Sequence, residues 1–218
     1  MRYEQQRAEI IEVCLRMRQM EFFLGTWGNV SVRVGGHILL TPSKVDYDVM
    51  RPEDLVVIDT QGNRVEGERT ATSEKEVHRQ IYVARADVGA IIHAHTKKAM
   101  AVSATALREV PCLVEEMSQL LGGAIPLAGR YVPAEQHVEL GGEAGKVIGQ
   151  KSGIILRNHG PVACGRDLRE AALVAQVIEK SCDIYLSLCG PLAAREIPGA
   201  FVESERYRFV HTYGHEQT

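Results

Sequence analysis

The sequence lacks the features that mark several classes of protein. Five cysteines, an odd number with no CxxC spacing, argue against a disulfide framework and a cysteine zinc site. No apolar run reaches the roughly 18 residues that span a bilayer, and the N-terminus has no apolar signal region. Charge of neither sign dominates, because 25 Lys and Arg face 28 Asp and Glu, a net charge of −3. Bulk charge therefore does not hold the protein to nucleic acid or to an anionic membrane, and we expect a cytoplasmic protein.

The composition and length fit an ordinary globular protein. Hydrophobic residues make up 45% and charged residues 24% of the 218 residues, as in ordinary globular proteins. The length suits one domain better than two, so we expect a single domain over residues 1–218, with 191–218 as a C-terminal tail. No repeat or low-complexity tract is present. Helical and strand patterns alternate along the chain, which predicts a mixed α/β domain with helices covering a sheet.

Periodicity places the expected elements. Ala8, Ile11, Leu15 and Phe22 recur at helical spacing and predict the buried face of a helix over 4–23. Gly35-Gly36 predicts the turn of a hairpin over 30–40. The other expected elements are a hairpin over 55–65, strands at 88–92 and 154–156, and helices starting near 73, 96, 135 and 167, with a helical end to 111–121. Ser73 and Glu76 are expected to form the capping box of the helix near 73, and Asp167 to cap the last long helix.

Three histidines at the ends of strands suggest a metal site. His93 and His95 are two residues apart at the end of an apolar strand, so their side chains point to the same face. By itself this pair is equally well explained by two histidines without a ligand. His159 follows another short apolar strand, at a sharp turn. A third imidazole would complete a site for zinc or another divalent first-row ion with a position left open for substrate, provided that the fold brings His159 to the pair.

Glu74 is the candidate acid or base. It lies in Thr72-Ser73-Glu74, at the predicted start of a helix. Acidic residues in a first turn commonly do no more than stabilise the helix dipole, so its position alone leaves both interpretations open. His78 lies four residues further on and could pair with Glu74 on the helix, but we interpret it as a surface or packing residue.

Three separate segments have the composition of an anion site. Gly25 to Asn29 contains glycines that let backbone amides approach a ligand. Thr41 to Lys44 adds a hydroxyl and a positive charge, and Thr72-Ser73 lies at a helix N-terminus, which favours phosphate. Each segment alone is typical of a turn or cap, so they form a site only if the fold brings them together.

These segments together resemble a known family. GTWGNVS (25–31), TPS (41–43), PED (52–54), EGERTATSEK (66–75), HAHT (93–96) and NHG (158–160) are similar, in order and spacing, to the class II aldolase/adducin-like family over about residues 5 to 190. The resemblance is strongest to its sugar-phosphate aldolases. It implies a three-layer α/β/α domain with a mostly antiparallel central sheet, and a homotetramer with active sites at the subunit interfaces.

The resemblance also implies a cofactor and site residues. It implies one divalent metal ion per subunit, Zn²⁺ first, with Mn²⁺, Fe²⁺ or Co²⁺ as alternatives, held by His93, His95 and His159. Glu74 would be a further metal ligand and the catalytic acid/base. The substrate phosphate would be bound by Thr26, Gly28, Asn29, Ser43, Lys44, Thr72 and Ser73.

The expected activity is cleavage of a phosphorylated sugar. A ketose 1-phosphate, such as L-fuculose 1-phosphate or another 5-deoxyketose 1-phosphate, would give dihydroxyacetone phosphate and an aldehyde through a metal-stabilised enediolate. A methylthioribulose-1-phosphate dehydratase, a sugar-acid-phosphate decarboxylase and a ribulose-phosphate 4-epimerase would use the same ligands and remain alternatives. A non-catalytic adducin-like interaction module has no need of three aligned histidines and Glu74, and the chain lacks the long basic tail of such an adapter.

The chain also departs from the family pattern. Trp27 stands where the related aldolases often have a small residue, and Lys44 stands where they have glycine. Glu116 occupies the position at which they carry a catalytic tyrosine, and Tyr207 or Tyr213 in the tail is a candidate replacement. The aldehyde end of the substrate is therefore where we expect this protein to differ.

Overall fold

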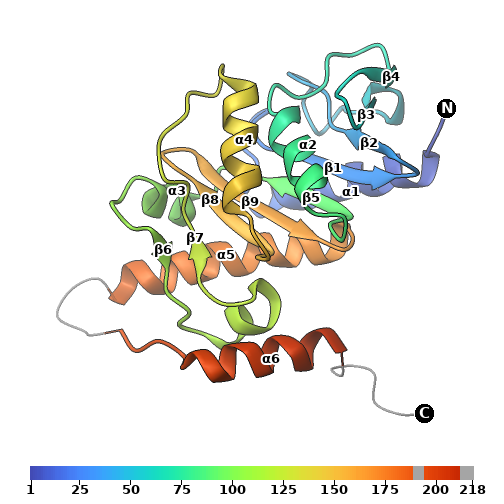
Figure 1. Cartoon of the computed structure of the whole chain (residues 1–218). Helices are drawn as coiled ribbons and strands as arrows, with labels where there is room; N and C mark the ends of the chain where they lie inside the picture. Colours follow the sequence, from blue (N-terminus) through green and yellow to red (C-terminus); the bar gives the residue numbers. More distant parts are fainter. Residues whose placement is uncertain (189–193, 212–218) are drawn as a thin grey trace.

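A seven-stranded antiparallel sheet forms the centre of the molecule (Figure 1). The computed structural model describes residues 1–188 and 194–211. The strands lie in the order β4-β3-β2-β1-β5-β9-β8, and every neighbouring pair is antiparallel. The strands of this sheet are β1 (Asn29–Val34), β2 (His37–Leu40), β3 (Val56–Asp59), β4 (Arg64–Glu66), β5 (Ala90–His93), β8 (Gly153–Leu156) and β9 (Gly160–Gly165). A separate small sheet pairs β6 (Glu109–Val110) with β7 (Ile125–Pro126).

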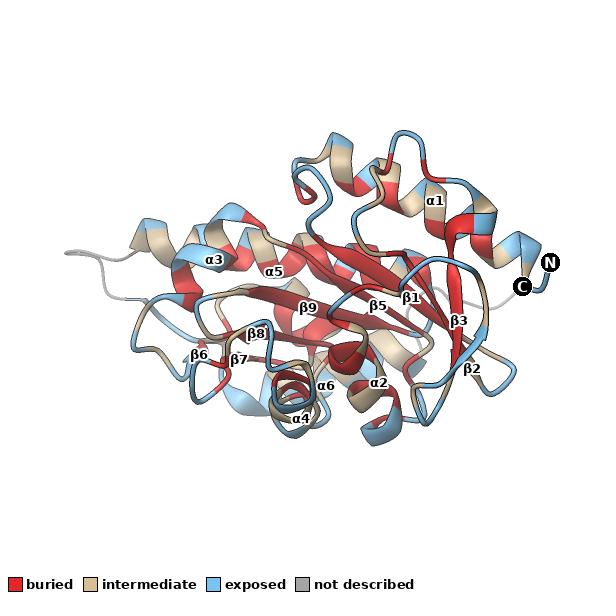
Figure 2. Ribbon diagram, turned by 90° about the horizontal axis from the view of Figure 1, so that it is seen from above, coloured by how far each residue is buried: buried red, intermediate tan, exposed pale blue. Residues whose placement is uncertain are grey.

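Helices cover both faces of the sheet and give three layers (Figures 1 and 2). α1, α3 and α5 pack on one face, and α2 and α4 pack on the other. This arrangement confirms the expected α/β/α fold with an antiparallel sheet. The helices are α1 (Glu4–Gln19), α2 (Lys75–Ala84), α3 (Lys97–Ser103), α4 (His137–Val147), α5 (Leu168–Leu188) and α6 (Gly199–His211), with short turns η1 (Pro52–Asp54) and η2 (Met117–Leu121).

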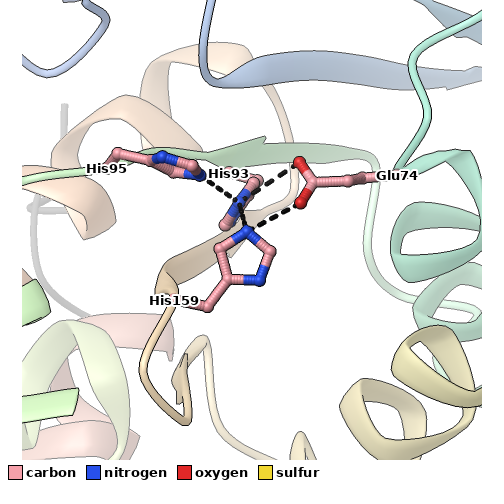
Figure 3. A group of neighbouring side chains, drawn as sticks. All are labelled: Glu74, His93, His95 and His159. Carbon is pink, nitrogen blue, oxygen red and sulfur yellow. Dashed lines mark hydrogen bonds and ion pairs between the residues drawn. The ribbon is translucent and has the colours of Figure 1, made fainter. Parts of the chain in front are cut away.

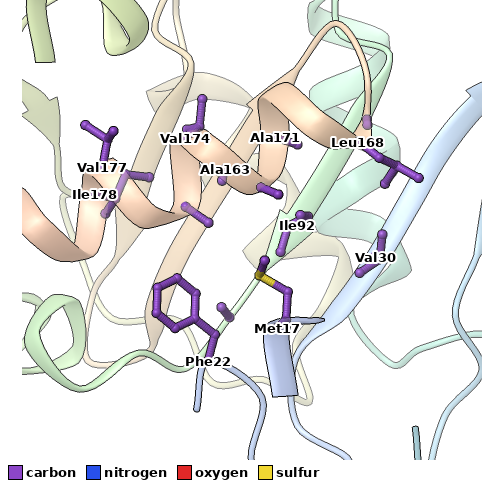
Figure 4. Close-up of a cluster of buried hydrophobic side chains, with 14 of the residues drawn as sticks. Met17, Phe22, Val30, Ile92, Ala163, Leu168, Ala171, Val174, Val177 and Ile178 are labelled. Carbon is purple, nitrogen blue, oxygen red and sulfur yellow. The ribbon is translucent and has the colours of Figure 1, made fainter. Parts of the chain in front are cut away.

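The central strands are buried on both faces, because each face carries its own apolar cluster. Along β5, Ala90 and Ile92 belong to one cluster and Ile91 to the other, as the alternation of side chains in a strand requires. Met17 of α1, Ile92 of β5 and Val174 of α5 pack in the first cluster (Figure 4). The end of β5, which carries the first two histidines, is therefore held by packing from both sides.

The buried face of α1 differs from the prediction. The helix ends at Gln19 rather than near residue 23, and Ala8 is exposed. Its buried residues are Arg7, Ile10, Cys14 and Met17. Arg7 can be buried because its guanidinium donates hydrogen bonds to the Leu55 carbonyl and pairs with Glu66 at 3.0 Å. Because a buried arginine that is hydrogen-bonded and ion-paired is tolerated, the buried face of α1 includes Arg7. This face lies one residue before the face that apolar periodicity alone predicts.

Both predicted hairpins are confirmed, but the short strands β6 and β7 and the central strand β9 were not predicted. Gly35 and Gly36 link β1 to β2 with φ of 51° and 84°, the left-handed conformation that such a turn needs. β9 was missed because it begins with Gly160-Pro161, a pair typical of a turn. In the structure β9 lies between β5 and β8 and pairs with both.

The two predicted helix caps have opposite outcomes. α2 begins at Lys75 with Glu74 as N-cap and no side-chain cap, so the predicted Ser73 cap is wrong. Glu76 instead bonds to Arg79 at 2.8 Å. The Asp167 cap is confirmed, because its Oδ1 accepts a 2.8 Å hydrogen bond from the backbone N–H three residues on.

The predicted C-terminal tail contains a helix. α6 packs beside η2, and Arg206 donates hydrogen bonds to the carbonyls of Gln119 and Leu120. The sequence has no clear helical period here because α6 has no fully buried residue. Among the described residues, no helix is both long and apolar enough to cross a bilayer. The described cysteines, Cys14, Cys112, Cys164 and Cys182, are buried and free.

Candidate metal centre

Four side chains from separate parts of the chain meet at one point (Figure 3). They come from the end of β5, from the turn that joins β8 to β9, and from the N-terminus of α2. His93 ends β5 and His95 follows it, while His159 lies in the turn between β8 and β9. β9 runs antiparallel to β5, with Val162 opposite His93. The start of β9 therefore lies beside the end of β5, and the turn carries His159 to the pair. Glu74 reaches the same point from the N-terminus of α2.

The four ligand atoms are close enough to share one ion. The Nε2 atom of His93 lies 3.1 Å from Nε2 of His95 and 3.3 Å from Nε2 of His159. The Glu74 carboxylate lies 2.8 Å from His159 and 3.3 Å from His93. All four ligand atoms lie within 4.8 Å of one another. Zinc–nitrogen bonds of about 2.0–2.1 Å imply a tetrahedral edge of about 3.3 Å, so the donor set fits a divalent ion.

The tautomer of His93 suits a metal ligand. Its Nδ1 lies 2.9 Å from the carbonyl oxygen of Pro161, which only accepts, so Nδ1 carries the hydrogen. Nε2 then presents its lone pair to the other imidazoles. A backbone carbonyl that fixes the orientation of a ligating imidazole is a common feature of metal sites.

The charges and pKa shifts of the candidate ligands favour binding of a cation among them. Burial acts to raise the pKa of Glu74, but the charges of and hydrogen bonds from His93 and His159 outweigh it and leave that pKa well below its usual range. Burial acts to lower the pKa of His93, but the Glu74 carboxylate outweighs burial and raises it. Burial, together with the neighbouring imidazoles, lowers the pKa of His95 to about 3. A neutral His95 and an ionised Glu74 are the ligand forms that a cation needs.

The backbone around His159 is fixed by its neighbours. A Cβ atom at Gly160 would lie 2.4 Å from the carbonyl oxygen of Ala94, so only glycine allows the two segments to approach this closely. Asn158 has a φ of 53°, in the left-handed region. Arg157 donates hydrogen bonds to three carbonyls on neighbouring segments, which anchors the turn to the rest of the fold.

The ligands open onto a cleft of about 350 Å³. The three loops that resemble an anion site all line it, together with Glu74, His95 and His159. The lining residues are Thr26, Trp27, Gly28, Asn29, Pro42, Ser43, Lys44, Thr72, Ser73, Glu74, His95, Ala134 and His159. The fold therefore brings the proposed metal ligands and all seven expected phosphate residues to one place.

Comparison with known proteins agrees with this geometry. The model of the class II aldolase and adducin N-terminal domain family matches residues 8–186. The chain belongs to the class II aldolase and adducin family. It is 31% identical over 190 residues to the L-fuculose phosphate aldolase of Methanocaldococcus jannaschii, covering 83% of this chain and 95% of that one. The Haemophilus influenzae L-fuculose phosphate aldolase is 30% identical over 216 residues, covering 94% of each chain.

A solved structure supports the same relationship. An L-fuculose 1-phosphate aldolase matches with a TM-score of 0.88 at 29% identity, covering 94% of this chain and 95% of that one. Similarity over nearly the whole of both chains extends the class II aldolase fold beyond the segment that the family model matches.

The positions at which this class II aldolase family member departs from the sequence pattern have distinct surroundings. Trp27 is 64% exposed, and its ring lies 6.1 Å from that of His95 at an interplanar angle of 29°. Glu116 forms a surface ion pair with Lys180 at 2.5 Å and does not line the cleft. Tyr207 is exposed on α6, and Tyr213 lies outside the described residues.

One group of buried polar residues was not predicted to act with Glu74. The Asn29 amide donates a 2.7 Å hydrogen bond to Glu74, and its oxygen accepts one from His78. His78 is fully buried, so it is not a surface residue, and it bonds to Asn29 and Ser31 rather than to Glu74. A signal was present in the sequence, because Asn29 and Ser31 lie two apart on β1 and must point to the same face.

Proposed function

We propose that this protein is a metal-dependent aldolase that cleaves a ketose 1-phosphate, such as L-fuculose 1-phosphate or another 5-deoxyketose 1-phosphate. The products would be dihydroxyacetone phosphate and an aldehyde. The observation that carries the proposal is the convergence of three imidazoles and Glu74 on one point of a cleft lined by hydroxyls and Lys44. The names of the similar proteins, which are fuculose-phosphate aldolases, support it.

The donor set suits one divalent ion per chain. His93, His95 and His159 would each contribute Nε2, and Glu74 would contribute a carboxylate oxygen. Three nitrogens with one oxygen fit Zn²⁺ best, and Mn²⁺, Fe²⁺ or Co²⁺ remain alternatives. When bound, such an ion supplies Lewis-acid stabilisation of the negative charge that develops on the ketone fragment during C–C cleavage.

Glu74 is the group that we assign to proton transfer. It is the only carboxylate that lines the described cleft. In the cleavage direction the ionised Glu74, displaced from the metal by the substrate, takes the proton of the hydroxyl on the carbon that becomes the aldehyde as the C–C bond breaks. It then passes that proton to the carbon that becomes the hydroxymethyl carbon of dihydroxyacetone phosphate, and the reverse direction moves the same proton back. A positioned carboxylate of this kind contributes about 10²- to 10⁴-fold to the rate.

The hydroxyl groups and the positive charge that line the cleft suit the phosphate. Lys44 provides a positive charge, and Thr26, Ser43, Thr72 and Ser73 provide hydroxyls. Gly28 has a φ of 91°, and a Cβ atom there would lie 2.3 Å from the ring of the buried Phe23, so glycine lets this backbone line the cleft. The N-terminus of the ten-residue helix α2 favours an anion. The Asn29 amide is bonded to Glu74 and His78, so we assign its side chain to Glu74 and the phosphate to the other six residues. Binding the phosphate orients the C–C bond to be cleaved at the metal centre.

The assembly and location of the enzyme follow from the family resemblance. We propose a homotetramer with active sites at the subunit interfaces, acting in the cytoplasm on a phosphorylated sugar. The exposed Trp27 ring lies beside His95 and gives the cleft an aromatic surface that the related aldolases often lack.

A panel of ketose 1-phosphates tests the activity. We expect the metal-loaded protein to release dihydroxyacetone phosphate from at least one 5-deoxyketose 1-phosphate, measured with a coupled reductase. The Glu74→Gln variant is the control and should release little. No release from any ketose 1-phosphate, at one bound metal ion per chain, would refute the aldolase and favour a dehydratase or decarboxylase.

A further inference from the structure

A chain of buried hydrogen bonds leads from Glu74 into the apolar layer beneath α2. The Asn29 amide nitrogen lies 2.7 Å from Oε2 of Glu74, and its oxygen lies 2.5 Å from Nε2 of His78. Oγ of Ser31 lies 2.6 Å from Nδ1 of His78 and 2.9 Å from the Tyr82 hydroxyl. All five side chains belong to buried residues. We call Asn29, His78, Ser31 and Tyr82 the relay.

The relay lies where two elements pack face to face. Asn29 and Ser31 are two apart on β1, and His78 and Tyr82 are four apart on α2, so each pair points to one face of its element. Asn29 also lies directly opposite His93 in the pairing of β1 with β5. The packing of α2 on the sheet therefore joins the relay to the metal centre.

The charge on Glu74 fixes the direction of the two hydrogen bonds that the Asn29 amide makes. An ionised carboxylate only accepts, so the Asn29 NH₂ must face Glu74 and its oxygen must face His78. Nε2 of His78 must then donate. Burial, followed by the nearby His93, lowers the pKa of His78 to about 3, so the neutral ring accepts at Nδ1 from the Ser31 hydroxyl. The reversed Asn29 amide would place its oxygen against the carboxylate, which is repulsive.

We propose that His78 and Ser31 are positioning residues, which orient the Asn29 amide so that it holds the Glu74 carboxylate at the metal centre. No hydrogen bond joins His78 or Ser31 to any of the four ligand side chains in the described part of the chain. Their effect is therefore transmitted by Asn29. Because this rests on the proposed metal role of Glu74, the test measures binding of the metal alone, separately from turnover.

Substitutions at His78 give the primary test. His78→Leu removes the donor to Asn29 and should weaken Zn²⁺ binding by about 10- to 100-fold, the usual effect of losing an outer-shell partner. Binding is measured by competition with a chromophoric chelator. His78→Gln keeps an N–H that can reach Asn29 and should restore most of the affinity. Unchanged affinity in His78→Leu, or no restoration by glutamine, would overturn the proposal.

A double-mutant cycle separates positioning from general loosening of the structure. In a Glu74→Ala background no carboxylate is left to position, so adding His78→Leu should change the Zn²⁺ affinity little. An equal loss in both backgrounds would show a purely structural role and would overturn the proposal.

A milder variant decides the matter if His78→Leu does not fold. Ser31→Ala removes only the hydroxyl that donates to His78, and Ser181→Ala on α5 is the matched control, because Ser181 is also buried and bonds only within its helix. Weaker Zn²⁺ binding in Ser31→Ala than in Ser181→Ala supports the relay, and equal binding refutes it. Absence of dihydroxyacetone phosphate release by the wild type would refute the proposed activity alone, since every arm here measures metal affinity.

Discussion

Low pH should lower the free energy of unfolding through protonation of His78 in the unfolded chain. The contribution of His78 can be measured by comparing the wild type with a variant that lacks the imidazole. The pKa of His78 is lowered from 6.5 to about 3 by burial first and by the charge on His93 second. The unfolded chain therefore binds a proton at His78 more readily than the folded chain between these two values. Stability rises with pH wherever the unfolded state binds more protons. The stability cost of His78 is thus absent above pH 6.5 and grows as the pH falls toward 3.

The size of the effect follows from the same two pKa values. Each pH unit well inside the window costs about 1.4 kcal/mol. From pH 6 to pH 4 the buried imidazole should lower the free energy of unfolding by about 2.5 kcal/mol. A His78→Gln variant lacks this titration and retains the hydrogen bond to Asn29. The stability difference, wild type minus variant, should therefore fall by that amount over the same interval.

Urea unfolding of the metal-free protein measures this difference. Circular dichroism is the better signal, since the single tryptophan, Trp27, is 64% exposed and reports poorly on the core. The wild type and His78→Gln are compared at pH 7, 6, 5 and 4, with Ser181→Ala as a control whose curve should run parallel to the wild type. Parallel curves for the wild type and His78→Gln would mean that His78 is not held neutral, and would refute the reasoning.

Three further substitutions test the centre and its surroundings. Glu74→Gln should keep bound metal, because three imidazoles remain, and lower kcat by about 10²- to 10⁴-fold; wild-type turnover would remove Glu74 from the mechanism. Lys44→Ala should raise KM for a phosphorylated ketose by about 10- to 100-fold, the value of a charged hydrogen bond, with steady-state kinetics as the assay; an unchanged KM would place the phosphate elsewhere. Gly160→Ala places a Cβ 2.4 Å from the Ala94 carbonyl oxygen and should lower the free energy of unfolding by about 1–3 kcal/mol. Gly142→Ala, with nothing within 4 Å of the new methyl group, should have no such cost, and equal thermal melting temperatures for the two variants would contradict the close contact at residue 160.

The sequence predicts the local parts of the metal centre well. The two-residue period of a strand predicts that His93 and His95 share one face. In the structure His93 is the last residue of β5 and His95 lies two residues beyond it, with their Nε2 atoms 3.1 Å apart. The sequence could not place His159, since this depends on β9 lying between β5 and β8. That strand begins with Gly160-Pro161, so local propensity indicates a turn. Sheet order is a long-range property, which hydrophobic periodicity does not contain.

The cleft also combines local segments that the sequence indicates with a three-dimensional arrangement that only the fold determines. Residue composition indicates three short segments as candidate anion-binding loops, and the fold brings all of them to one cleft. Spacing alone suggested that His78 could pair with Glu74 on one helix. In the structure α2 begins only at Lys75, and Glu74 instead turns to the histidines and to Asn29. Glu74 therefore lies outside the helix as its N-cap, and the four-residue helical spacing to His78 does not bring the two side chains together.

Metal content tests the central claim most directly. The wild-type protein and the variants His93→Ala, His95→Ala and His159→Ala would be purified, dialysed against metal-free buffer and measured by elemental analysis. We predict about one divalent ion per chain in the wild type, the capacity of a single four-ligand site, and clearly less in each variant. A wild type without metal, or full occupancy in all three variants, would contradict a metal centre built from these residues.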